Sequence, residues 1–203
     1  MSDLALESLK QRIKERLPDE VYHEGLGIYG PFGANGGLEV LYKLIKWRNE
    51  NPDANLEEFL KELRYPIYDW HNLNELDIKK YISNSDNEIS QALTPDVIAQ
   101  MLGTIEKYYK EQTGNDITLN KEHKGDFNSG THIIEQDLAV IATAFGQYVI
   151  EGTIDINIKE LAESALRRQT LDIFINLIND NTERSNMKNQ FELMLSDLSK
   201  IVK

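Results

Sequence analysis

The stretch THIIEQDLAVIATAFGQYVIE, residues 131–151, is the most apolar run of the chain and decides the predicted fold. Its apolar side chains recur at steps of three and four residues, which places them on one helical face. Neighbouring apolar residues widen this face over most of the circumference, which is typical of a helix buried among other helices. The face consists of Ile134, Leu138, Ile141, Ala142, Phe145 and Val149, widened by Ile133, Val140, Ala144 and Tyr148.

Polar residues mark the ends of this predicted helix. Gly152 can end it, because glycine adopts the left-handed backbone conformation without strain. Glu135 and Asp137 lie in the first turns, where acidic side chains complement the positive end of the helix dipole. Together with Gln136 and Gln147 they interrupt the apolar run, so we predict a core helix and no membrane span.

The composition is that of a globular protein. The chain has 203 residues, of which 40% are hydrophobic and 28% charged, enough for one large domain or two small ones. The net charge is −12, and each of the segments 1–93 and 94–203 carries 17 acidic and 11 basic residues. Since no basic module is present, the overall field repels a phosphate backbone, and we expect no nucleic-acid partner.

Two absences in the sequence narrow the function further. There is no cysteine, which excludes disulfides, thiolate catalysis and cysteine-based zinc sites. Residues 1–17 contain early acids and an apolar spacing of three to four, without the basic segment and apolar block of a signal peptide. We therefore expect a cytoplasmic protein without a membrane partner.

The rest of the chain is also predicted to be mainly helical. The fold class is mostly α, a multi-helix bundle of about 6–8 helices with at most a minor β pair. Short connections between long helices predict that neighbouring helices are antiparallel. The β pair would join Ile117 and Leu119 to Ile154 and Ile156. We predict a short-helix region at 1–93 and a long-helix bundle at 94–203, or one continuous domain. The other predicted helices are 3–17, about 38–51, 56–64, 74–83, 86–92, 94–114, 157–179 with a capping box of Asn157 and Glu160, and 187–201.

A glycine-rich segment precedes the helix predicted at 38–51. Six of the twelve glycines lie between Gly25 and Gly37, which predicts a loop with several special backbone positions. A phosphate-binding loop does not fit, because no strand precedes it and Lys43 lies inside the following helix. Two interpretations stay open: a tightly packed loop anchored by Tyr29 and Phe32, or a loop that contacts a ligand or partner.

A second candidate site is the acidic, histidine-containing stretch at 122–137. His132 and Glu135 are one helical turn apart, and with His123 and Asp126 they could bind one metal ion. A calcium loop of the EF-hand type does not fit, since its glycine and final glutamate fall at the fifth and tenth positions. The alternative is a charged loop whose acids favour the N-terminus of the following helix.

Other polar residues offer no motif. His23 and His71 lie in no GxSxG or HExxH pattern. Arg167 and Arg168 form an isolated basic pair that we predict to be solvated.

Aromatic residues are concentrated in the first half of the chain. Ten of seventeen lie between residues 22 and 81, including both tryptophans. Tyr65, Tyr68 and Trp70 surround Pro66 in a predicted turn, and such side chains dominate binding hot spots. The alternative interpretation is that they pack against the helix predicted at 38–51.

Three functions follow as hypotheses. The first is a non-enzymatic interaction or regulatory protein that binds a protein partner, and its acidic charge could also neutralise a basic one. The second is a metal-dependent enzyme that uses the 123–137 cluster, and the third is an assembly subunit that self-associates through its long helices. The absence of a catalytic motif favours the first, and no cofactor is predicted. Its contact residues would be Tyr29, Phe32, Tyr65, Tyr68 and Trp70.

Overall fold

The chain forms two compact units in the computed structural model. The first joins Met1–Glu75 to Ile133–Lys203, and the second is Leu76–His132. The boundary predicted near residue 93 therefore falls inside the second unit, because the two ends of the chain pack together. The structure describes residues 3–23, 29–33, 35–63, 76, 78–80, 82–84, 100, 103–104, 106–107, 109–111, 114, 129–176, 178 and 180–201.

Helix α6 (Ser129–Glu151) is the core helix of the first unit, as predicted. Phe145 is fully buried, and nearly every side chain from Ala139 to Val149 is inaccessible to solvent. By length and composition Ile133–Glu151 could cross a membrane, and 72% of its most apolar window is buried inside the protein. The helix ends at Gly152, whose φ of +83° is the left-handed conformation that glycine allows.

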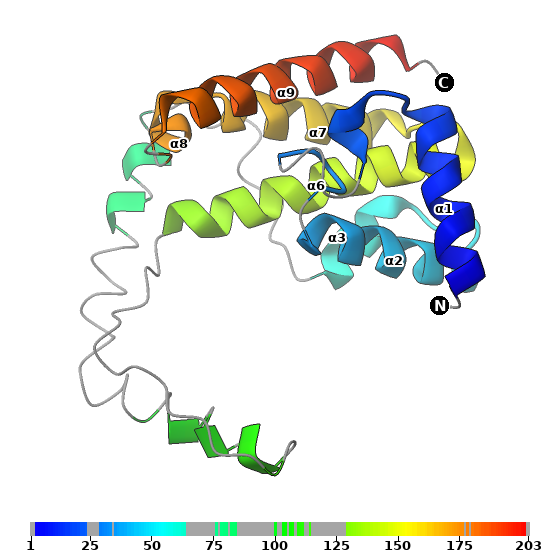
Figure 1. The fold of residues 1–203 in the computed structure, drawn as a ribbon, viewed down its shortest axis with the longest axis horizontal. Helices are drawn as coiled ribbons and strands as arrows, with labels where there is room; N and C mark the ends of the chain where they lie inside the picture. The colour runs from blue at the N-terminus through cyan, green and yellow to red at the C-terminus, as the bar shows by residue number, and fades with distance from the viewer. Residues whose placement is uncertain are drawn as a thin grey trace. The chain divides into compact units, whose positions relative to one another are not determined.

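Two more helices pack along α6. They are α7 (Ile156–Gln169) and α9 (Asn181–Lys200). The chain direction reverses after α6 and again before α9, so α7 is antiparallel to both, and consecutive long helices are antiparallel as predicted (Figure 1). Asp180 caps α9, because its side chain accepts a hydrogen bond of 2.8 Å from the Glu183 backbone N–H.

The prediction of one helix over 157–179 is wrong. The chain leaves the helical conformation after α7, and the short helix α8 (Asp172–Ile175) follows. Leu171 is extended (φ −68°, ψ 143°) and serves as the N-cap of α8. Thr170 is the C-cap of α7, and both its backbone N–H (3.2 Å) and its hydroxyl (2.7 Å) donate to the Arg167 carbonyl.

The minor β pair is not found among the residues that the structure describes, all of whose regular structure is helical. Ile156 is the first residue of α7, so it cannot belong to a strand. Asp155 is the N-cap, and the predicted capping box does not form. Asn157 instead donates a hydrogen bond of 2.8 Å to Glu57. Ile117 and Leu119 lie outside the described residues.

The N-terminal helices cover α6 and use the same core. They are α1 (Asp3–Arg16), the 3-10 helix η1 (Glu20–Tyr22), α2 (Asn35–Glu50) and α3 (Leu56–Glu62). The Tyr22 ring lies 4.9 Å from that of Phe145, centroid to centroid. Asn55 caps α3 as predicted, accepting from the Glu57 backbone N–H at 2.9 Å. In Figure 1, α2 and α3 lie on the side of α6 opposite α9.

Polar contacts tie these helices to the C-terminal half. The Arg16 guanidinium donates to the Tyr148 carbonyl at 2.6 Å, and Arg48 pairs with Glu151 at 2.7 Å. Two cations thus lie at the C-terminal end of α6, where positive charge is favourable. The buried Tyr22 hydroxyl donates to Asp197 at 2.7 Å. Burial and this hydrogen bond raise the Tyr22 pKa, so the phenol stays protonated.

The second unit is described only in part. Its described residues within the helix predicted at 74–83 are helical. Gly114 ends a helix where predicted, with φ +72° and a hydrogen bond of 2.9 Å from its N–H to the Lys110 carbonyl. Residues 86–92 and the predicted helix start at Thr94 lie outside the described part.

Helix α2 begins at Asn35, inside the glycine-rich segment and earlier than predicted. Gly37 is buried there, and a Cβ atom at this position would lie 1.8 Å from the Pro31 carbonyl oxygen. By contrast, a Cβ at Gly36 would meet nothing within 4 Å. The glycine at 37 is therefore needed for close backbone approach.

We expect Gly37→Ala to destabilise the protein by about 1–3 kcal/mol or more, because backbone atoms must move to admit the methyl group. Gly36→Ala is the matched control and should not lower stability. Denaturant unfolding measures both. Equal stabilities for the two variants would mean that the Pro31–Gly37 contact is not as the structure has it.

Candidate functional site

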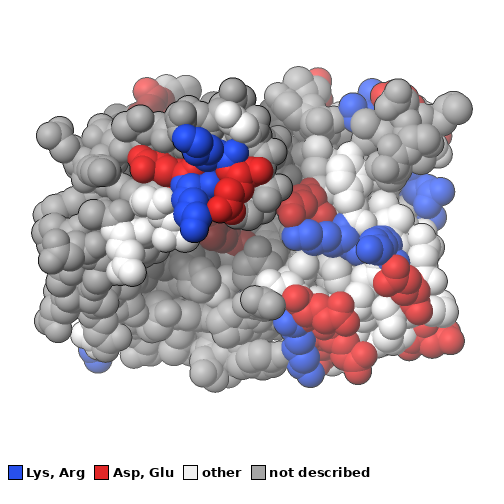
Figure 2. All heavy atoms as spheres, turned by 90° about the horizontal axis from the view of Figure 1, so that it is seen from below, with Lys and Arg blue, Asp and Glu red and all other residues white. Residues whose placement is uncertain are grey.

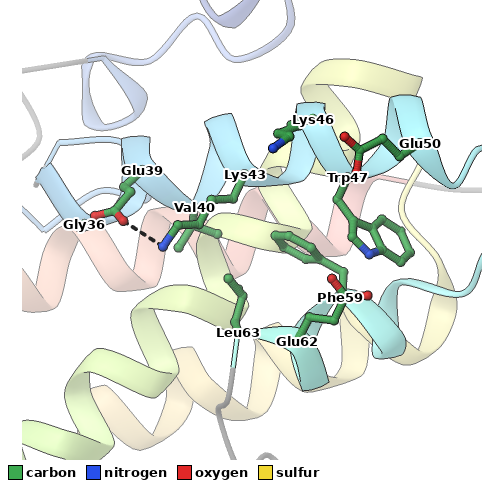
Figure 3. Close-up of a pocket in the computed structure, with 10 residues that line it drawn as sticks. All are labelled: Gly36, Glu39, Val40, Lys43, Lys46, Trp47, Glu50, Phe59, Glu62 and Leu63. Atoms are coloured by element: carbon green, nitrogen blue, oxygen red, sulfur yellow. Dashed lines mark ion pairs between the residues drawn. The ribbon is translucent and has the colours of Figure 1, made fainter.

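A groove of about 530 Å³ lies between α2 and α3 (Figure 3). We call it the α2–α3 groove. One helical face of each element lines it, since the lining residues recur at steps of three and four along both helices. They are Gly36, Glu39, Val40, Lys43, Lys46, Trp47, Glu50, Phe59, Glu62 and Leu63.

The floor of the groove is aromatic and aliphatic. The Trp47 and Phe59 rings are tilted by 52° with centroids 5.5 Å apart, a favourable aromatic geometry. Both rings belong to the core, and Val40 is buried beside them. Leu63 is half-buried and faces α2 from the end of α3 (Figure 3). The floor is thus an apolar surface formed by side chains that also belong to the core, with Leu63 more exposed at one end.

The Trp47 indole N–H is an unsatisfied donor in this floor. Trp47 is 6% exposed, and its Nε1 atom has no hydrogen-bond acceptor among the residues that the structure describes. Figure 3 shows this nitrogen on the indole edge that is turned toward α3. Leaving a buried donor unpaired costs about 1–3 kcal/mol, and such groups in native proteins call for an explanation. An acceptor supplied by a bound molecule would satisfy it.

The rim of the groove carries charges of both signs. Lys43 and Glu39 neutralise each other in an ion pair of 2.7 Å. No ion pair in the described part of the chain neutralises Lys46, Glu50 or Glu62, which leaves two acids against one base. On the face drawn in Figure 2, acidic and basic side chains are interspersed.

The predicted contact residues of the glycine-rich segment are anchored in the core. Phe32 is fully buried, so it cannot be an exposed contact residue in this conformation. Tyr29 is half-buried, with its ring 6.3 Å from that of Phe191 and its N–H donating to Gln190 at 3.3 Å. Burial and the charge of Glu183 raise the Tyr29 pKa. These contacts agree with the alternative of a packed loop.

The aromatic turn is a prediction that the structure does not describe. Tyr65, Tyr68 and Trp70 lie outside the described residues, which stop at Leu63 and resume at Leu76. Leu63 is part of the α2–α3 groove, so the turn follows directly from the groove wall in the sequence.

The predicted metal cluster is described only at one end. His123 and Asp126 lie outside the described residues, and His132 belongs to α6 without a described side chain. Glu135 is exposed on the same helix. Among the described residues, no three His, Cys, Asp or Glu side chains are close enough to hold a metal ion. The metal site stays a prediction.

Asp137 belongs to a buried ion pair. Arg168 reaches both of its oxygens, at 2.7 and 3.1 Å, and Gln169 donates at 2.5 Å. Burial raises the pKa of the Asp137 carboxyl, while the hydrogen bonds and charge of Arg168 oppose this effect. The network joins α6 to α7, and its hydrogen bonds occupy the carboxylate, so its role is structural.

The prediction that both arginines are solvated is therefore wrong for one of them. Arg168 is 7% exposed, whereas Arg167 is exposed as predicted. A signal was present in the sequence: Ile158, Ala162, Ala165 and Gln169 follow the helical spacing, and all four are buried. Arg168 follows Ala165 by three residues, so extending this buried face to the end of the helix would have placed Arg168 at the edge of the face.

Comparison with protein-family models, curated proteins and solved structures finds no match to this chain. Its function therefore has to be argued from the α2–α3 groove and its surroundings.

Proposed function

We propose that this protein is a non-enzymatic interaction protein that binds a segment of a protein partner in the α2–α3 groove. The observation that carries the proposal is the combination of an apolar floor with the unpaired Trp47 donor. Interfaces are built in this way, with a desolvated aromatic centre and a polar rim. A groove between two helices also suits an extended or helical peptide segment.

The position of the groove also supports this proposal. It contains Gly36 from the glycine-rich segment and Leu63, which precedes the aromatic turn in the sequence. The aromatic turn was expected to supply contact residues. In this proposal Tyr65, Tyr68 and Trp70 also contact the partner.

The chemistry of the lining favours binding over catalysis. It offers apolar area, one indole donor and the charges of lysine and glutamate side chains. Of these side chains, Trp47 carries a buried donor that has no acceptor among the residues that the structure describes. Groups of this kind fix the orientation of a bound segment.

The test compares proteins captured from the native source by the wild type and by two blocked variants. Gly36→Phe adds a ring where the structure has open space, and Leu63→Lys places a charge on the apolar wall. Gly36→Ala is the matched control, because it changes the same residue without filling the groove. Thermal melts of all variants check that they are folded.

We expect the wild type and Gly36→Ala to capture one protein that both blocked variants lose or bind at least roughly ten-fold less. Such a loss corresponds to the removal of one hot-spot contact. If folded blocked variants capture the same proteins in equal amounts, the groove is not the binding site and the proposal is wrong.

A further inference from the structure

We infer that the groove selects a basic segment, in which an apolar side chain is flanked by Lys or Arg. This inference rests on the proposed function and specifies the chemistry of the partner. It is carried by the rim charges, the apolar floor and the Trp47 indole.

The charge of the rim favours a basic segment. Once Glu39 and Lys43 neutralise each other, Glu50 and Glu62 outnumber Lys46. The surrounding field has the same sign, since the whole chain carries −12. A cationic residue beside the groove therefore gains from both the local and the overall field, whereas an acidic segment would be repelled.

The floor requires an apolar anchor next to this cationic residue. A volume of about 530 Å³ lies within the usual range of ligand pockets, about 300–1,000 Å³, and accommodates a large side chain. Val40, Trp47, Phe59 and Leu63 offer that side chain apolar contacts from both helices. Without an anchor, rim charges alone would give only weak and salt-sensitive attraction.

The Trp47 N–H specifies what the backbone of the segment must provide. It needs an acceptor, and a carboxylate is disfavoured beside Glu50 and Glu62. A backbone carbonyl is neutral and is present in every peptide. We therefore assign the Trp47 indole the role of binding a main-chain carbonyl of the basic segment.

The test uses a displayed library of random short peptides selected on the immobilised full-length protein. Peptides that combine a large apolar residue with nearby Lys or Arg should be enriched, and added salt should weaken their binding. Glu50→Gln and Glu62→Gln should each lower the affinity by roughly two- to five-fold, as for exposed charge pairs. Glu58→Gln is the matched control, because it removes an exposed charge of α3 outside the groove lining.

The indole gives a direct spectroscopic readout. In ¹H–¹⁵N spectra the Trp47 Nε1–H resonance should move downfield when a selected peptide binds, as expected on gaining an acceptor. The Trp70→Phe variant identifies which of the two tryptophan signals belongs to Trp47.

The outcomes distinguish an error about the chemistry of the bound segment from an error about the groove as a binding site. If selected peptides lose binding to Gly36→Phe but are acidic or neutral, or are insensitive to Glu50→Gln and Glu62→Gln, the basic segment is wrong and the groove still binds protein. An indole signal that stays in place overturns the role assigned to Trp47. If no peptide is selected, or if selected peptides ignore both blocked variants, the inference fails together with the proposed function.

Discussion

Asp137→Ala is expected to lower the free energy of unfolding by about 3–5 kcal/mol, because it leaves the Arg168 guanidinium buried without its counter-charge. Both side chains are almost inaccessible, at 4% and 7% exposure, so water cannot replace the lost contact without a local opening. Gln169 would lose its acceptor at the same time. Denaturant unfolding at neutral pH measures the loss.

Two controls separate the buried charge from other effects of the substitution. Arg167→Ala removes the adjacent exposed arginine and should change stability by less than about 0.5 kcal/mol. The double variant Asp137→Leu with Arg168→Met should recover most of the loss, because apolar replacement of a buried ion pair is often neutral or stabilising. A loss below about 1 kcal/mol for Asp137→Ala would mean that the pair is solvated.

Phe145→Ala should cost about 3–5 kcal/mol, the usual range for removing a buried aromatic side chain. Phe145 has no exposed surface, and it packs against Tyr22 from the N-terminal half of the chain. The cavity would therefore weaken contacts between segments distant in sequence. Chemical unfolding of the variant and the wild type measures the difference.

The matched control for Phe145→Ala is Ile156→Ala, since Ile156 is 48% exposed at the start of α7. It should cost much less, because less apolar surface is returned to water. Equal losses for the two variants, or a loss below about 1 kcal/mol for Phe145→Ala, would show that α6 is not the centre of the core.

Helices with one dominant apolar face were the predictable part of this fold. The spacing around Phe145 identifies α6, and Gly152 marks its end, because both signals are local. The end of α7 was less visible in the sequence. The helix is interrupted at Thr170 and Leu171, but the apolar pattern continues past them to Phe174. The spacing along α7 places Arg168 at the margin of a buried face, but it does not reveal the partner on another helix, Asp137, that neutralises the buried charge.

The candidate site was less predictable, because it too depends on how separate helices meet. Trp47 and Phe59 follow the helical spacing of core residues, and they are core residues. The groove beside them exists only because α2 and α3 meet at a particular distance and angle, which is tertiary information. Phe32 was expected as a contact residue on composition alone, whereas the core that buries it comes from both ends of the chain.

The central claim is that a partner occupies the α2–α3 groove, and photo-cross-linking tests it most directly. A photoreactive amino acid replaces Lys46 on the rim, or the exposed Lys188 of α9 as the control. Each protein is then irradiated in an extract of the native source. The account predicts one major adduct from position 46, absent from position 188 and lost when Gly36→Phe is added. Identical adducts from both positions, or an adduct at 46 that persists with Gly36→Phe, would contradict it.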